Sequence, residues 1–272
     1  MSCTIAQALQ QGTACIGRAE TLILLSYVLQ KSKTYIIAFD DTGLTSQQES
    51  HFHTLVRRRQ KGCPVPYLTG QQEFFGRAFH VSPHVLIPRP DTEILIEYVL
   101  SLPKPPMSVL DLGTGSGCIA ITLAKELPQT LVYASDISMD ALQIAKENAQ
   151  RHHANVQFYC GSWWDAIPTD LQVECIISNP PYIHGKDPHL QNLRYEPSHA
   201  LTDFADGLSC YQAILSQAKK HLLPQGRIIF EHGWDQGKAL RTLLCDTGFQ
   251  KIYTIKDLGN NDRITTGVWE IE

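Results

Sequence analysis

The sequence has 272 residues, of which 43% are hydrophobic and 18% charged, and its formal net charge is −4. This balance is typical of a folded globular protein and excludes an intrinsically disordered chain. The acidic net charge disfavours a protein that grips a nucleic-acid backbone along its length, because such proteins are usually basic.

The first 70 or so residues are expected to form helices, because apolar residues recur at helical spacings between residues 5 and 29. Residues 45–49 (TSQQE) hold two overlapping capping boxes, which predict the start of a helix that ends near Gly62. The basic residues at 57–61 would lie at its C-terminal end, where cations are favoured. Prolines and a glycine between residues 64 and 70 then break the pattern, so we predict a helical N-terminal domain over residues 1–72.

Residues 73–90 change to aromatic and β-branched residues interrupted by Gly76 and Pro83, which predicts a hairpin linker. A helix is expected over 91–100, and strands and helices alternate from residue 107 onward. Strands are predicted at 108–112, 131–135, 156–159, 175–178, 227–231, 249–256 and 265–271, and helices near 116–127, 138–152, 207–222 and 235–247. This alternation predicts that residues 91–272 form an α/β domain with a seven-stranded, mostly parallel sheet and helices on both faces. Ligands of such sheets bind beyond the carboxyl ends of the strands.

A glycine-rich turn follows the first strand of this domain, in the sequence VLDLGTGSGCIAI (109–121). Gly113, Gly115 and Gly117 allow the backbone to approach a ligand closely. Asp136, at the end of the next strand, can accept hydrogen bonds from both hydroxyls of a ribose. These features favour a nucleotide or nucleoside site over a simple strand-to-helix turn.

The glycine spacing distinguishes between nucleotides. A dinucleotide fingerprint needs a glycine at position 118, which is Cys118, and no Gly-Lys-Ser/Thr follows to form a P-loop. Asp111, just before the glycines, would repel a pyrophosphate and attract a cation. We therefore expect a ligand that carries a ribose and an ammonium or sulfonium group, and S-adenosylmethionine carries both.

Two tryptophans, Trp163 and Trp164, follow the third strand in GSWWDAI. An aromatic ring at this place can cover an adenine ring, although two tryptophans in the core or at its rim would give the same pattern. Many methyltransferases carry an acid just before this aromatic residue to accept the adenine amino group. Ser162 occupies that place here, which puts this hydrogen bond in doubt.

The fourth strand ends in SNPPYI (178–183), beside the expected nucleoside. Pro180 and Pro181 lack backbone N–H donors and have a fixed φ, so their carbonyls remain acceptors, and Asn179 adds a side-chain carbonyl. We expect Asn179 and Pro180 to grip a planar –NH2 group while Tyr182 offers a flat face to the group attached to it. Held in this way, the poorly nucleophilic nitrogen can direct its lone pair at a sulfonium methyl, and no strong base is required. The amine of a nucleobase and the side-chain amide of a glutamine both satisfy this chemistry.

Six motifs occur in order along the chain: PVPYLTGQQEFFGRAFHV, VLIPRPDTE, DLGTGSGCIAI, SNPPYI, DGLSCYQAI and EHGWDQG. This set resembles the bacterial peptide chain release factor glutamine methyltransferases of the HemK/PrmC family, most specifically from Pro64 onward. The resemblance implies a small helical N-terminal domain joined to a Rossmann-like class I S-adenosylmethionine-dependent methyltransferase domain, and we predict that the N-terminal domain helps to dock the substrate. It implies methylation of the N(5) nitrogen of the glutamine in the Gly-Gly-Gln tip of class 1 release factors, which tunes translation termination.

The resemblance also implies roles for single residues. Gly113, Thr114, Gly115, Ser116 and Gly117 would hold the methionine part of S-adenosylmethionine, Asp136 its ribose and Trp163 its adenine, with Asn179 beside it; S-adenosylhomocysteine would be the product. Asn179 and the carbonyl of Pro180 would hold the glutamine amide, while Pro181 and Tyr182 shape its slot. Arg89 and Glu93 would either line a cleft or form a salt bridge at the joint between the domains, and Glu231 receives no role.

The remaining features concern the compartment and the partners. The eight cysteines match no zinc or disulfide framework, so we expect no metal and mostly buried thiols in a reducing compartment. The first residues lack the pattern of a signal peptide, and the apolar stretch 21–29 is too short to cross a bilayer. We therefore expect a soluble, cytoplasmic monomer that binds release factors and makes no contact with membranes or direct contact with nucleic acid.

Three alternatives remain open from the sequence. An adenine-N6 nucleic-acid methyltransferase would use the same Asn-Pro-Pro-Tyr, although an extended basic target-recognition region is lacking. A glutamine methyltransferase of a large-subunit ribosomal protein would share all the motifs. A scaffold that binds the cofactor and a release factor without turnover is disfavoured by the intact Asn179 and glycine turn.

Overall fold

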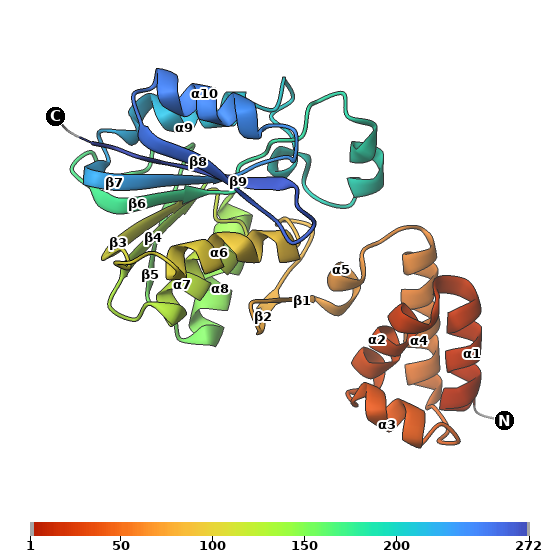
Figure 1. The fold of residues 1–272 in the computed structure, drawn as a ribbon. Helices are drawn as coiled ribbons and strands as arrows, with labels where there is room; N and C mark the ends of the chain where they lie inside the picture. Colours follow the sequence, from red (N-terminus) through yellow and green to blue (C-terminus); the bar gives the residue numbers. More distant parts are fainter. Residues whose placement is uncertain (1–2, 271–272) are drawn as a thin grey trace. The chain divides into compact units, whose positions relative to one another are not determined.

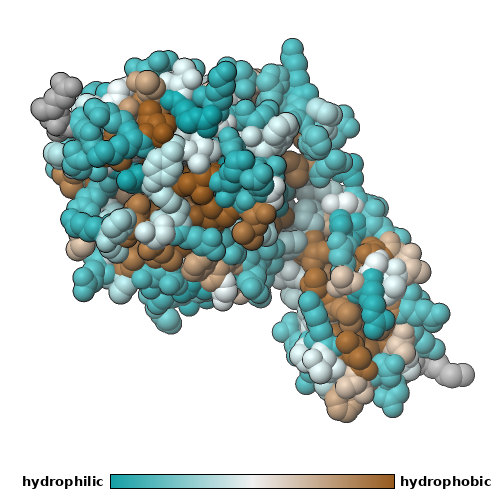
Figure 2. All heavy atoms as spheres, viewed as in Figure 1, coloured by the Kyte–Doolittle hydropathy of each residue, from teal (hydrophilic) through white to brown (hydrophobic). Residues whose placement is uncertain are grey.

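The computed structural model describes residues 3–270 and divides into two compact units, Met1–Gln71 and Gln72–Glu272 (Figure 1). The first unit is helical. Its helices are α1 (Ile5–Ile16), α2 (Arg18–Leu29), α3 (Lys33–Ala38), α4 (Ser46–Gln60) and α5 (Val65–Thr69). Space-filling atoms show hydrophobic surface on both units (Figure 2).

The helical unit is held together where α1 crosses α2 and α4. A Cβ atom on Gly12 of α1 would lie 2.5 Å from Cγ2 of Thr21 and 2.9 Å from Cζ of Phe52, so only glycine permits this approach. The predicted start of α4 is confirmed, because Thr45 and Gln48 form a reciprocal capping box. The basic residues of this helix do lie in its last turn.

The second unit begins with a hairpin of β1 (Gln71–Phe74) and β2 (Arg77–His80), followed by the 3-10 turn η1 (Pro90–Thr92) and α6 (Glu93–Leu100). The alternating region contains β3 (Ser108–Leu112), α7 (Cys118–Glu126), β4 (Leu131–Asp136), α8 (Met139–His152), β5 (Val156–Cys160) and β6 (Val173–Ser178). It continues with η2 (Pro188–Leu193), η3 (Ser198–Ala200), α9 (Ser209–Ala218), β7 (Leu222–Glu231), α10 (Gly237–Asp246), β8 (Gln250–Lys256) and β9 (Asp262–Val268).

Within the described residues the main sheet has seven strands in the order β5-β4-β3-β6-β7-β9-β8. The pairs from β5 to β7 are parallel, and β9 runs antiparallel to both of its neighbours. This confirms the predicted mostly parallel, seven-stranded sheet. One strand is longer than predicted: β7 begins at Leu222 rather than Arg227, because a register shift opposite it accommodates Pro224 and Gly226 within the strand.

Alternate residues of the strands enter two separate hydrophobic cores. Leu110, Ile176 and Phe230 belong to one core, while Val109 and Ile177 belong to the other. Helices α9 and α10 cover the face of the first core, and α6, α7 and α8 cover the face of the second (Figure 1). This is the two-residue period of a strand buried on both faces. The sheet is therefore rigid, and its carboxyl edge offers fixed positions to the loops that follow the strands.

One of the contacts that attach the hairpin to the sheet domain is a buried amide. Asn148 of α8 accepts a hydrogen bond from the His80 amide at 2.7 Å and donates to the carbonyls of His80 and Ser116 at 3.0 and 2.9 Å. The hairpin and the glycine turn are thus fixed to the same helix.

Two further sequence expectations concern thiols and membranes. All eight cysteines are free, and four of them are buried, so the expectation that most lie in the core holds for only half. Of the helices in residues 3–270, none is both long and apolar enough to cross a membrane.

Candidate active site

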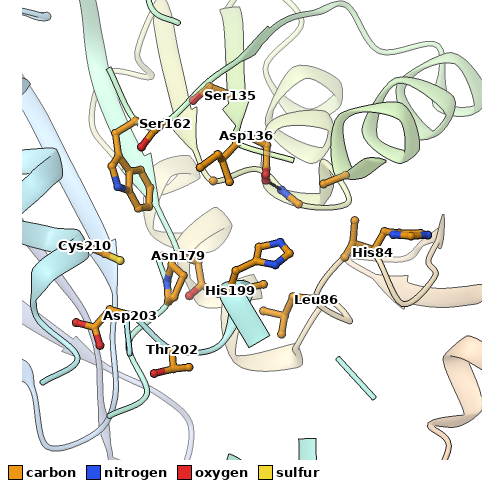
Figure 3. Close-up of a pocket in the computed structure, with 18 of the residues that line it drawn as sticks. His84, Leu86, Ser135, Asp136, Ser162, Asn179, His199, Thr202, Asp203 and Cys210 are labelled. Carbon is orange, nitrogen blue, oxygen red and sulfur yellow. Dashed lines mark hydrogen bonds between the residues drawn. The ribbon is translucent and has the colours of Figure 1, made fainter. Parts of the chain in front are cut away.

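A pocket of about 260 Å³ lies at the carboxyl edge of the parallel sheet, where β3, β4, β5 and β6 end (Figure 3). Its walls come from the glycine turn, the end of β4, the loops after β5 and β6, and the segments 84–86 and 199–204. The predicted site residues that line it are Gly113, Gly115, Asp136, Trp163, Asn179 and Pro181; those that do not are Thr114, Ser116, Gly117, Pro180 and Tyr182.

The glycine turn needs its glycines for two different reasons. Gly113, Gly115 and Gly117 all have positive φ, at +78°, +55° and +82°, where a side chain is strained. At Gly117 a Cβ would also lie 2.7 Å from Cδ1 of Ile121. At Gly115, in contrast, a Cβ would meet nothing within 4 Å, so this backbone faces the open pocket.

Asp136 is held beside the turn with both carboxylate oxygens engaged. Oδ2 accepts a hydrogen bond from the Gly115 amide and Oδ1 from the Ser138 amide, each at 2.9 Å. Burial raises the pKa of Asp136, while these two amides and nearby His199 oppose the shift. Each carboxylate oxygen has a further lone pair, so Asp136 can still accept two hydroxyl hydrogens from the pocket side.

Asp111 does not face the pocket as its place before the glycines suggested. Its side chain is fully buried, and Oδ2 accepts a hydrogen bond from Thr114 Oγ1 at 2.6 Å. Burial raises the pKa of Asp111 to about 7. Asp111 therefore stabilises the turn from within, and of these two acids Asp136 is the one that lines the pocket.

The two tryptophans have different surroundings. Trp163 lines the pocket, and a Cβ on Gly113 would lie 3.6 Å from its ring. Trp164 is buried: its Nε1 donates to the Ile214 carbonyl at 2.9 Å, and its ring stacks on His221 at 4.7 Å between centroids. Of the pair, only Trp163 can contact a ligand.

Asn179 and Pro181 reach the pocket from the end of β6, and Pro180 between them is buried. Asn179 Nδ2 lies 3.4 Å from Oγ1 of Thr92. The Tyr182 carbonyl accepts a hydrogen bond from Gln236 Nε2 at 3.0 Å, and burial, reinforced by the nearby Glu231, raises the pKa of the Tyr182 phenol to about 12. The segment is thus anchored at both of its ends.

The far wall of the pocket is a loop that sequence reasoning did not single out. Asp203 organises it by accepting hydrogen bonds from the amides of Ala205, Gly207 and Ser209 and from Ser209 Oγ, at 2.7 to 3.1 Å. Burial alone would raise the pKa of Asp203, but these hydrogen bonds lower it overall. The available signal was the Asp-Gly turn before α9 in DGLSCYQAI, which marks a loop but not its direction.

Arg89 and Glu93 make structural contacts within the second unit. Arg89 forms an ion pair with Glu196, whose carboxylate also accepts a hydrogen bond from the Ile87 amide at 3.1 Å. Glu93 accepts a hydrogen bond from the Phe75 amide at 2.8 Å. Neither residue lines the pocket.

Comparison with known proteins places this chain in a family. Residues 5–70 match the model of the PrmC N-terminal domain, and residues 90–195 match the methyltransferase small domain. The chain is similar to the release factor glutamine methyltransferase of Yersinia pestis, with 46% identity over 92% of this chain and 91% of the relative. The corresponding protein of Neisseria gonorrhoeae is 42% identical over 94% and 95% of the two chains.

Among solved structures, a methyltransferase from Pyrococcus furiosus has the same fold, with a TM-score of 0.56 and 18% identity over 84% of this chain and 100% of that one. The second unit therefore has the Rossmann-like fold of the class I S-adenosylmethionine-dependent methyltransferases, as predicted. The identity over nearly the whole length is decisive: this chain belongs to the family of release factor glutamine methyltransferases.

Proposed function

We propose that this protein transfers a methyl group from S-adenosylmethionine to the side-chain amide nitrogen of the glutamine in the Gly-Gly-Gln motif of class 1 release factors, and so tunes translation termination. Family membership supports the reaction type. The observation that carries the proposal is that Asn179 and Pro181 line the same pocket as Gly115 and Asp136. A group held by Asn179 would thus lie next to a ligand held by the glycine turn.

The pocket fits S-adenosylmethionine by the chemistry of its walls. Open space in front of the Gly115 backbone admits the methionine part of the cofactor. The N-terminal end of α7, which follows the turn, favours its carboxylate. Asp136 retains lone pairs for the ribose hydroxyls, and Trp163 offers an aromatic face to the adenine.

The bound cofactor supplies a methyl group on a positively charged sulfur. Asn179 and the carbonyl of Pro180 accept the two amide hydrogens of the glutamine, which turns the nitrogen lone pair toward that methyl group. Positioning of this kind contributes roughly 7–11 kcal/mol to a rate enhancement in favourable cases. The N–CH3 bond would form as the S–CH3 bond breaks, which leaves S-adenosylhomocysteine. The cationic amide nitrogen would then lose its proton to water, so no strong base is needed.

The helical unit is proposed to dock the release factor, over residues 1–72. Its surface exposes apolar side chains that a partner can cover: Ile37 and Phe39 are 54% and 51% exposed. Deleting residues 1–70 should raise KM for an intact release factor and leave S-adenosylmethionine affinity unchanged. An unchanged KM would remove this role.

The proposed substrate is tested by incubating the protein with labelled S-adenosylmethionine and purified release factors, large-subunit ribosomal proteins and DNA. We expect label on the release factor, mapped by mass spectrometry to the Gly-Gly-Gln glutamine. Label on a ribosomal-protein glutamine or on adenine would replace this function with one of the alternatives. Cofactor binding without any transfer would indicate a scaffold.

A further inference from the structure

Two buried polar residues, Thr92 and Glu231, lie next to Asn179. Ser178 of β6 pairs with Phe230 of β7 in parallel register, so Asn179 and Glu231 follow side by side at the sheet edge. Thr92, at the end of η1, approaches the same place, with Oγ1 3.4 Å from Asn179 Nδ2. Thr92 and Glu231 are only 3% and 1% exposed, which prevents water from freely replacing their contacts.

The hydrogen-bonding capacity of this cluster restricts how it can be arranged. A threonine hydroxyl has one hydrogen to donate, an ionised carboxylate only accepts, and a primary amide has a donating and an accepting end. Burial raises the pKa of Glu231 to about 7, while hydrogen bonding from Thr92 and Asn179 and the charge of Arg263 oppose that rise by favouring the ionised carboxylate. When Glu231 is ionised and accepts the single hydrogen of Thr92, the Thr92 oxygen is left to accept a hydrogen from Asn179.

We propose that Thr92 and Glu231 are positioning residues that fix the side-chain amide of Asn179 with its –NH2 group facing inward and its Oδ1 facing the pocket. In this arrangement the –NH2 group of Asn179, its only donor, is directed at the buried oxygens of Thr92 and Glu231. Asn179 then presents an acceptor to the substrate at every turnover. This inference rests on the proposed function, in which Asn179 accepts a hydrogen from the glutamine amide.

The opposite orientation of Asn179 would oppose the reaction. Its –NH2 group would face the –NH2 group of the substrate, so donor would meet donor, while Oδ1 would be directed at acceptors in the cluster. A rotation of the amide changes no shape, so packing alone cannot select between the two orientations. Selection requires a partner of defined polarity, and Thr92, whose Oγ1 lies 3.4 Å from Asn179 Nδ2, supplies it when its own hydrogen is given to Glu231.

The test removes the Thr92 hydroxyl without changing its shape. Thr92→Val should lower kcat for release-factor methylation about 10-fold or more, with S-adenosylmethionine affinity within about twofold by calorimetry. Thr92→Ser, which keeps the hydroxyl, should restore most of the activity. Thr122→Val is the matched control, because Thr122 is a fully buried threonine of α7 whose Oγ1 has no hydrogen-bond partner within the described part of the chain.

A double-mutant comparison separates positioning from a structural role. If Thr92 acts through Asn179, then Thr92→Val should cause no further loss of transfer when Asn179 is already alanine. A further loss there, an unchanged kcat in the single variant, or a parallel loss of cofactor binding would each overturn the inference. Failure of the wild-type protein to methylate any release factor would instead overturn the proposed function, so the two failures are distinguishable.

Discussion

The backbone amide of Gly115 donates a hydrogen bond to Oδ2 of Asp136 at 2.9 Å. The glycine turn after β3 and the acid at the end of β4 are therefore locked together before any ligand arrives. A site that is already assembled loses little entropy when its ligand binds. This contact would let the two proposed cofactor motifs act as one site, although 20 residues of chain lie between them.

Replacing Asp136 with Asn should weaken S-adenosylmethionine binding. The variant keeps the shape of the side chain but loses the charge and one acceptor, and hydrogen bonds to a charged group contribute about 1.5–3 kcal/mol. We expect Kd to rise about 10- to 100-fold in calorimetry. The control is Asp170→Asn, an exposed acid outside the pocket, and equal affinities of the two variants would contradict the assigned role.

Alanine variants of two glycines with similar backbone angles can separate the effect of backbone strain from the effect of blocking the pocket. Gly115 and Gly76 have φ of +55° and +70°, and at both a Cβ would meet nothing within 4 Å. Alanine at either position should therefore cost a similar roughly 1–2 kcal/mol of folding free energy, measured by urea unfolding. Only Gly115→Ala should block the pocket and abolish cofactor binding, and binding that survives in this variant would show that the turn does not face the ligand.

The adjacent tryptophans should respond differently to truncation. Trp164→Ala removes a buried ring and should destabilise the fold by about 3–5 kcal/mol. Trp163→Ala should cost less stability but lower S-adenosylmethionine affinity, because its ring lies against the Gly113 side of the pocket. Thermal unfolding and calorimetry on both variants check this. If one variant lost more than the other in both stability and cofactor affinity, the prediction would be wrong.

Stability should fall as pH rises because of Glu231. Burial raises its pKa from 4.5 to about 7, so the folded protein holds a proton that the unfolded chain releases above about pH 4.5. The stabilising contribution is complete below pH 4.5 and is lost as pH rises through about 7. Between pH 5 and 8, Glu231→Gln should gain on the order of 2–3 kcal/mol relative to the wild type in urea unfolding. A pH-independent difference between the two proteins would remove this explanation.

The regular elements could be predicted because their signals are local. The Thr45–Gln48 capping box and the period-two strands are readable from a few neighbouring residues. The longer β7 was not predicted, because Pro224 and Gly226 usually end a strand and only the pairing with β6 explains their presence.

The site could be predicted only for residues that belong to a recognisable motif at the end of a strand. Gly115, Asp136 and Asn179 lie at or shortly after the carboxyl ends of three strands, so their meeting at one edge was expected from the topology. The burial of Asp111 and the contact of Thr92 with Asn179 were not predicted, because burial and the direction of a side chain depend on how separate segments pack.

The central claim is that Asn179 holds the substrate amide while the glycine turn holds the cofactor. Asn179→Ala is its most direct test, with calorimetry for S-adenosylmethionine and labelled methyl transfer to a release factor measured on the same preparation. We predict a cofactor Kd within a few-fold of the wild type and a transfer rate reduced about 100-fold or more. Transfer at the wild-type rate would contradict the account.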